Sequence, residues 1–140
     1  MTNVPVHETQ LGMSRVVSGS FDATIDSVTA ALKEQGFGIL SDIDVAATLK
    51  DRLGADMEPY RILGACNPGL AHQALAADRS IGLLLPCNVV VREVEPGSVE
   101  VSIADPKAVF SLAPAETMGH VTDLPGAARE RLAAALAALA

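Results

Sequence analysis

Both cysteines of this 140-residue chain are followed by asparagine, and each Cys-Asn pair has a proline beside it. The pairs lie in the stretches 65–68 (ACNP) and 85–88 (LPCN). In each stretch an apolar run meets a change of chain direction, where folds commonly present side chains to a ligand. Together with the histidine nearest to them in the sequence, the pairs give the candidate ligand-binding residues: Cys66, Asn67, Cys87, Asn88 and His72.

Cys66 is predicted to lie between the end of a strand and a helix that begins at Asn67-Pro68. Unpaired N–H groups and the dipole at a helix N-terminus favour a thiolate, so we expect the pKa of Cys66 to lie somewhat below its ordinary value. A catalytic cysteine also needs a base, and His72 is the histidine close to it in the sequence. Because His72 flanks the apolar stripe of its predicted helix, it also suits a histidine that faces water. The catalytic residues therefore stay unknown.

Three interpretations of the cysteine pair remain open. If the strands that carry Cys66 and Cys87 are neighbours in a sheet, the two sulfurs lie close together. In the first interpretation the thiols are small buried hydrophobic groups. In the second they are ligands for a small molecule or a soft metal, and in the third they are a dithiol used in redox chemistry. CxxC spacing and a second pair of metal ligands are missing from the sequence, which argues against a structural zinc site. The sequence identifies no cofactor and leaves enzymatic activity open.

Composition limits the partners of the chain. Its net charge of −7 argues against nucleic acid and anionic lipid, because phosphate binding needs a basic surface. The polar start lacks the pattern of an export signal, and the most apolar stretch, 81–91, is too short to span a membrane. We therefore expect a cytoplasmic protein, in which cysteines stay reduced.

Local patterns predict the elements that position these residues. A loose lead-in is expected over 1–11 and a single α+β domain over 12–140. Up to the first cysteine we expect a strand at 13–17, a helix at 21–35, a strand at 37–43, a short helix at 45–53 striped by Val45, Leu49 and Leu53, and a buried strand at 60–66. Beyond it we expect a helix at 68–77 that buries Leu70, Ala71, Ala74 and Leu75, a strand at 81–94 interrupted at Pro86, a strand at 98–103, an irregular stretch at 107–123 and a closing helix from about 125. This order predicts helices on one side of an antiparallel sheet.

Four stretches carry a resemblance to a known family: GFGILSDIDV (36–45), LGACNP (63–68), GLLLPCNVVV (82–91) and Asp105-Pro106. Over about residues 12–140 the chain resembles the domain of unknown function 302 family. The resemblance implies a topology similar to that of the TATA-binding-protein superfamily, with a curved antiparallel sheet and helices on one face. It also implies homodimers, and it implies no established activity. DNA binding does not follow from the fold.

The closing helix bears on the oligomeric state. After Leu132 it contains only alanine and leucine up to Ala140, so a partner subunit would suit its exposed side. The same composition also suits a helix that faces water, because alanine is the best helix former and its small side chain is harmless there. The expected partners are thus a second copy of the chain and either a small molecule or a soft metal, with no nucleic acid and no membrane.

Overall fold

The computed structural model describes residues 6–139. Within this range, six strands form one antiparallel sheet in the order β1-β2-β6-β5-β4-β3. The strands are β1 (His7–Glu8), β2 (Gly12–Ser18), β3 (Gly38–Asp44), β4 (Tyr60–Cys66), β5 (Cys87–Glu95) and β6 (Ser98–Ala104). β1 falls in the predicted lead-in, of which residues 1–5 lie outside the described residues, so the division at residue 12 stays a prediction.

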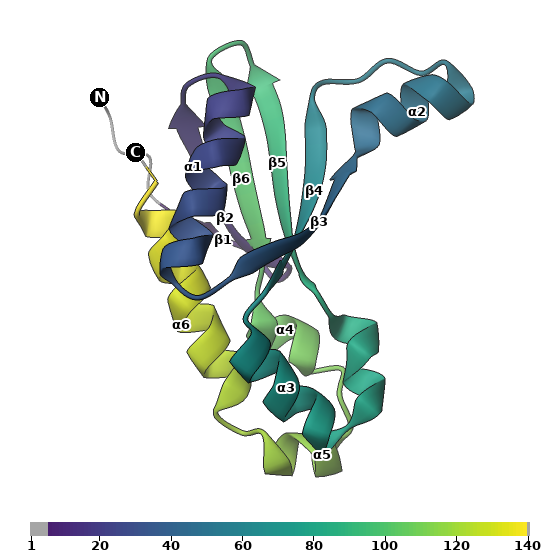
Figure 1. Cartoon of the computed structure of the whole chain (residues 1–140). Helices are drawn as coiled ribbons and strands as arrows, with labels where there is room; N and C mark the ends of the chain where they lie inside the picture. Colours follow the sequence, from purple (N-terminus) through teal and green to yellow (C-terminus); the bar gives the residue numbers. More distant parts are fainter. Residues whose placement is uncertain (1–5, 140) are drawn as a thin grey trace.

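Two helices, α1 (Phe21–Glu34) and α6 (Leu124–Ala137), cover one face of this sheet (Figure 1). α1 begins where the Ser20 side chain accepts a hydrogen bond from the backbone N–H of Ala23 at 3.1 Å. It ends before Gly36, whose φ of +83° is the left-handed conformation that glycine adopts without strain. The predicted α+β fold, with helices on one face of an antiparallel sheet, is confirmed.

We call the apolar interior between this face and the two helices the sheet core. Strand alternation directs every second side chain of β2, β4, β5 and β6 into it. Its most completely buried members include Leu63, Val89, Val91, Val99, Val101, Leu132 and Leu136. Because α6 packs its leucines here, its exposed residues are the charged Glu130 and Arg131 and the alanines Ala134 and Ala137. An exposed leucine face for a partner is therefore missing from the described part of this helix.

A buried charge, Arg15, joins β2 to the end of α6. Its guanidinium donates hydrogen bonds to the carbonyl oxygens of Leu136 and Ala137 at 3.0 and 3.1 Å. The last carbonyls of a helix have no partner within the helix and carry negative partial charge, so a buried cation suits them. Arg15 thereby anchors the C-terminal turn of α6 to the sheet.

Beyond one end of the sheet lies a second group of helices, which we call the lobe: α3 (Pro68–Ala77), the 3-10 helix η1 (Arg79–Leu84), α4 (Pro106–Phe110) and α5 (Ala115–His120) (Figure 1). The lobe has its own buried cluster of Ala74, Ile81 and Phe110. The bounds predicted for α3 are confirmed, although of its four predicted core residues only Ala74 is fully buried. The stretch predicted to be irregular contains α4 and α5.

The strand predicted over 81–94 is wrong in its first part. Residues 79–84 form η1, a cis peptide bond joins Leu85 to Pro86, and β5 begins only at Cys87. A short apolar run suits a buried helix as well as a strand. Asp78 determines the outcome, because its carboxylate caps η1 by accepting a hydrogen bond from the backbone N–H of Ser80 at 2.9 Å.

The segment of residues 40–58, which we call the α2 arm, projects from the sheet and carries α2 (Val45–Leu53) (Figure 1). Asp44 caps α2 and Gly54 ends it with a φ of +66°, as predicted. Yet no residue of α2 is buried, and Leu53 is 74% exposed. The side chains predicted to be buried, Val45, Leu49 and Leu53, are therefore not part of a hydrophobic core, because no other described segment covers the exposed side of α2. No helix within residues 6–139 is long and apolar enough to cross a bilayer.

Candidate functional site

Cys66 and Cys87 meet at the ends of two neighbouring strands. β4 and β5 are antiparallel partners, and their register sets Ala65 opposite Cys87, with Cys66 as the last residue of β4. The hypothesis that these strands are neighbours is confirmed. Both thiols are free, and both line one cavity at the start of α3.

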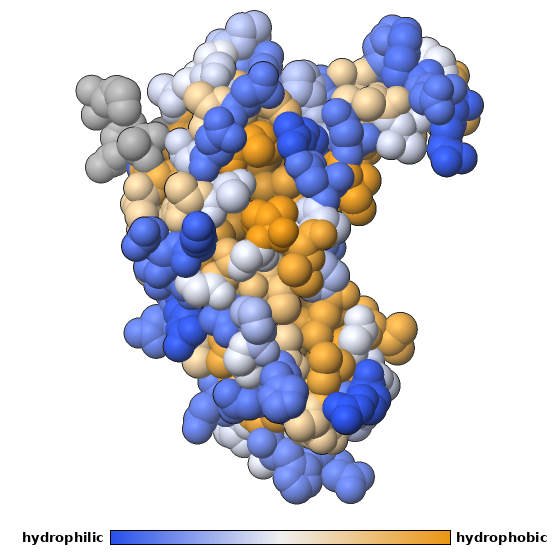
Figure 2. Space-filling view, in the orientation of Figure 1, coloured by the Kyte–Doolittle hydropathy of each residue, from blue (hydrophilic) through white to orange (hydrophobic). Residues whose placement is uncertain are grey.

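This junction cavity, of about 30 Å³, lies between the sheet core and the lobe. One wall comes from the side of the sheet and its helices: Phe37, Ala65 and Ala128. The other wall comes from the lobe: Ala74, Leu85 and Phe110. Figure 2 shows a band of hydrophobic residues that runs from the sheet to the lobe, across the junction of the two. The cavity is large enough for a water-sized group, and its walls are apolar.

Asn67 lines the cavity and also fixes the start of α3. Its side-chain oxygen accepts a hydrogen bond from the backbone N–H of Leu70 at 3.1 Å, which is the capping role predicted from the sequence. Its amide nitrogen lies against Gly36, where a Cβ would come within 2.9 Å of it. Gly36 therefore ends α1 and also leaves room for the Asn67 side chain that caps α3. The C-terminus of α1 and the N-terminus of α3 consequently lie next to each other.

The thiols are less acidic than the sequence suggested. Burial raises the pKa of Cys66, so the expectation of a lowered pKa at the helix N-terminus is wrong. Burial raises the pKa of Cys87 further, to about 11, and the neighbouring Cys66 adds to this shift. Desolvation of the charged form among apolar walls is the main cause of both shifts. Both cysteines are consequently protonated at neutral pH.

A close crossing of two backbones directs Cys87 into the cavity. The ring of Pro86 packs over Gly64 of β4, where a Cβ would lie 2.7 Å from the Pro86 Cγ. Strand alternation then sends Cys87 toward the helix-covered face and Asn88 toward the opposite face. Glycine at position 64 is thus required for the close packing of Pro86 against β4. This packing fixes the start of β5, from which Cys87 and Asn88 point to different sides.

The predicted site residues are only partly brought together. Cys66, Asn67 and Cys87 share the junction cavity, whereas Asn88 does not line it and meets Cys87 only in a separate hollow beside Pro86. The exposed His72 lines neither of them. Among the described residues, no group of three or more His, Cys, Asp or Glu side chains is placed to hold a metal ion. A base for Cys66 and a multidentate metal centre are therefore unsupported at this cavity.

Sequence reasoning found the α3 residues that line the cavity but missed the rest of its lobe side. Phe110 and Leu124 line it from segments that carried no periodic pattern, and Leu85 lies in a run predicted as strand. The one usable signal was that Phe110 is one of three phenylalanines in the chain, which marks it as a core residue without naming its neighbours.

Comparison with known proteins identifies the family. The family model of the domain of unknown function DUF302 matches residues 13–139. The chain is also similar to an uncharacterized conserved DUF302 protein from Bacillus stearothermophilus, whose crystal structure aligns with a TM-score of 0.75 at 30% sequence identity over 88% of this chain and 93% of that chain. No curated protein sequence matches the chain. The chain therefore belongs to the DUF302 family.

Proposed function

We propose that this protein binds a small, uncharged molecule in the junction cavity at Cys66 and Cys87. The observation that carries the proposal is the convergence of two free thiols on one apolar cavity between two separate hydrophobic clusters. Small-molecule sites occur preferentially where two structural units meet, with apolar walls and a few polar groups that orient the ligand.

The two walls of the cavity differ in the number of contacts behind them. On the sheet side, Phe37 and Ala65 belong to a cluster that includes the strands, α1 and α6. On the lobe side, Phe110 and Ala74 belong to a cluster of three buried residues. Since few apolar contacts mean a low cost of local opening, the lobe can move away to admit a ligand larger than water. The protonated thiols then supply weak S–H donors and polarisable contacts.

A pair of matched variants tests the proposal by two-dimensional NMR with benzene as the probe. Ala71→Leu fills the cavity from α3, and Ala76→Leu adds the same side chain at an exposed position of the same helix. We expect saturable shifts at α3 and at Cys87 in the wild type and in Ala76→Leu, and none in Ala71→Leu. A wild type without saturable shifts, or equal binding by all three chains, contradicts the proposal.

A soft monovalent metal ion is the metal chemistry that two sulfurs alone can serve. It would displace the protons of Cys66 and Cys87, which raises the cost of binding in proportion to the raised pKa values. Titration with Ag⁺ tests this version. One ion bound per wild-type chain, lost in both Cys66→Ser and Cys87→Ser, supports it, and binding that survives either change contradicts it.

A dithiol redox role is the second candidate, and it is favoured by the closeness of the thiols, since Cys66 raises the pKa of Cys87. With peroxide as oxidant, the two thiols would lose two protons and two electrons, forming one S–S bond while the peroxide is reduced to two waters. Mass spectrometry after mild peroxide treatment tests it: a Cys66–Cys87 disulfide supports the role, and only single-site oxidation contradicts it. Both proposals agree with the expected cytoplasmic location, where thiols stay reduced.

We also propose that the chain forms a homodimer through the α2 arm. Its exposed hydrophobic residues are Leu40, Ile43 and Leu53. The arm carries charges of both signs, including Asp51 and Arg52, so two copies related by a twofold axis can complement each other. Light scattering after chromatography should give a dimer for the wild type and for the control Leu112→Glu, and a monomer for Leu53→Glu. A wild-type monomer contradicts this proposal.

A further inference from the structure

We infer a second ligand site, for an uncharged molecule with an unbranched alkyl chain, in a groove on the face of the sheet opposite α1 and α6. This open-face groove lies between the β1–β2 hairpin, β6, the start of β5 and α4, and it measures about 500 Å³. Small-molecule sites typically measure roughly 300–1,000 Å³. The groove shares no lining residue with the junction cavity, and the hollow beside it shares Leu85, Cys87 and Phe110 with that cavity.

The depth of the groove follows from strand register. On this face Gly12 lies opposite Ala104, and Ser14 lies opposite Ser102, so two adjacent rows of β2 and β6 carry small side chains. The next row begins with the larger Val16. Rows of small residues beside larger ones leave a hollow along the strands, in which an extended chain can lie.

The groove continues into a hollow of about 220 Å³ that runs toward Pro86. The two share the lining residues Asn88, Ala104 and Val109. Leucines stand at both ends: Leu11 in the groove is 84% exposed, and Leu83 in the hollow is 89% exposed. An elongated apolar ligand would cover both leucines, whose exposure otherwise costs free energy in water.

Three polar side chains of β2, β5 and β6 in the groove are free to orient a ligand. Ser14, Ser102 and Asn88 line it, and their side chains make no hydrogen bond to another group within residues 6–139. The two hydroxyls and the amide offer donors and acceptors together. They suit a hydroxyl or amide head group at one end of an apolar chain.

Charge determines that the head group is neutral. Among the described lining residues of the groove there is no lysine or arginine, and the one imidazole, that of His7, is exposed to solvent on β1, so an anion finds no permanently charged partner. The one carboxylate in the lining is Glu100, which accepts a hydrogen bond from Arg92 Nε at 2.8 Å and is already paired. An anionic head would lose its hydration without a counter-charge, and a cationic head would have to displace Arg92.

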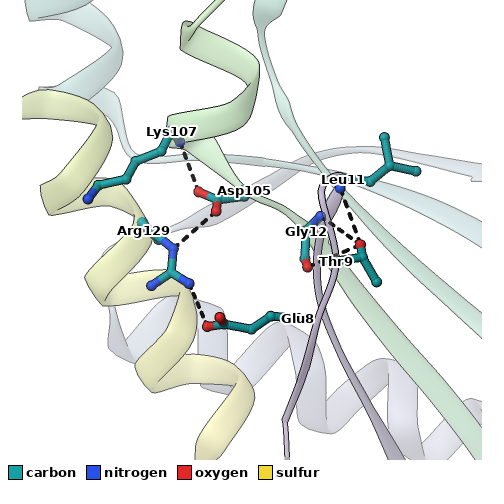
Figure 3. A network of polar contacts seen from close by, with 7 residues as sticks. All are labelled: Glu8, Thr9, Leu11, Gly12, Asp105, Lys107 and Arg129. Atoms are coloured by element: carbon teal, nitrogen blue, oxygen red, sulfur yellow. Dashed lines mark hydrogen bonds and ion pairs between the residues drawn. The ribbon is translucent and has the colours of Figure 1, made fainter.

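A polar network holds the two edges of the groove in place (Figure 3). The guanidinium of Arg129 donates to Glu8 of β1 at 2.6 Å and to Asp105 at 3.1 Å. The other carboxylate oxygen of Asp105 accepts from the backbone N–H of Lys107 at 2.9 Å and so caps α4. β1 and α4 are therefore fixed to α6 before any ligand arrives, which lowers the entropic cost of binding.

Three probes with the same alkyl chain and different charge test the inference: 1-octanol, octanoate and octyltrimethylammonium. Ser102→Leu fills the floor of the groove. Ser98→Leu is the matched control, since Ser98 lies on the same strand and the same face but outside the groove. Binding is followed by two-dimensional NMR of the full chain, and Ala71→Leu is included to fill the junction cavity separately.

We expect saturable shifts with 1-octanol at Ser14, Asn88 and Ser102, and affinities at least about tenfold weaker for the two charged probes. Ser102→Leu should weaken 1-octanol binding at least about tenfold, while Ser98→Leu and Ala71→Leu bind as the wild type does. Unsaturable shifts over all exposed leucines, or wild-type affinity in Ser102→Leu, would overturn the site. Equal binding of octanoate would overturn the assignment of an uncharged ligand. Loss in Ala71→Leu would show that the junction cavity is the site occupied.

Discussion

The sheet core and the lobe are built from different amounts of apolar contact. In the sheet core, buried aliphatic side chains of four strands and two helices form one continuous cluster. In the lobe, an apolar cluster of three buried residues lies among four short helices, and polar contacts supply part of the connection, such as the hydrogen bond from the Thr117 hydroxyl to Asp78 at 2.8 Å. The junction cavity thus has one wall held by many contacts and one held by few. A site of this kind keeps its position on the sheet and adjusts its size through the lobe.

The largest expected effect comes from a cavity in the sheet core. Leu132 is fully buried between the sheet and α6, so Leu132→Ala should lower the free energy of unfolding by about 3–4 kcal/mol. Urea denaturation measures the loss, and hydrogen exchange should accelerate in the sheet and the lobe together. Leu53→Ala in the α2 arm is the control, with an expected change within about 0.5 kcal/mol in the monomer. A loss confined to the lobe would contradict the idea that the sheet core carries the fold.

The matching change in the lobe is Phe110→Ala. Since Phe110 is the largest member of the buried cluster there, we expect a loss of about 3 kcal/mol in the free energy of local opening. Hydrogen exchange should accelerate in α3, η1 and α4 and stay unchanged in β5 and β6. Equal acceleration in both regions would mean that the sheet core and the lobe unfold as one unit.

The thiol of Cys87 reports on the closure of the cavity. Burial raises its pKa to about 11 from an ordinary 9.0, so at pH 8 its thiolate is about 100-fold scarcer than in the unfolded chain. Alkylation by iodoacetamide, followed by mass spectrometry, should be slower by about this factor and should become faster in Phe110→Ala. An ordinary alkylation rate in the wild type would contradict the burial. Because the pKa of the Cys87 thiol is higher in the folded protein than in the unfolded chain, this thiol contributes to the free energy of unfolding below pH 9.0. The contribution is lost as the pH rises toward 11.

The smallest effect concerns acid. Hydrogen bonds from Ser80 and then from Thr117 lower the pKa of Asp78 below its ordinary 3.8. Because the pKa of Asp78 is lower in the folded protein than in the unfolded chain, the Asp78 carboxylate contributes to the free energy of unfolding at pH values above the pKa of the unfolded chain. This contribution is lost as the pH falls through the pKa of the folded protein. Below about pH 4 the lobe should therefore loosen before the sheet, as residue-resolved hydrogen exchange can measure. Thr117→Val should reduce this difference, and an unchanged acid response in that variant would contradict the assignment.

Local chemistry made the elements predictable. The caps at Asp44 and Asn67, the proline at position 68 and the alternation through Val99 and Val101 act within a few residues, so the sequence alone placed these elements correctly. The pairing of the strands that carry the cysteines was left open by the sequence, and the register of β4 and β5 settles it.

Long-range contacts explain what was missed. The apolar run at 81–84 carries no period that separates strand from helix, and the cap at Asp78 decides it. The wall at Phe110 comes from a segment without a pattern, and burial of the thiols depends on that wall. The pKa of Cys66 was therefore predicted in the wrong direction: the helix end can be read from the sequence, whereas the desolvation cannot.

A crystal structure under xenon pressure tests the shared cavity most directly, because xenon binds in small apolar cavities and scatters strongly. We expect one xenon atom bounded by the sulfurs of Cys66 and Cys87 and by the ring of Phe110. The two sulfurs on separate surfaces, or a water-filled space with no xenon between them, would contradict it.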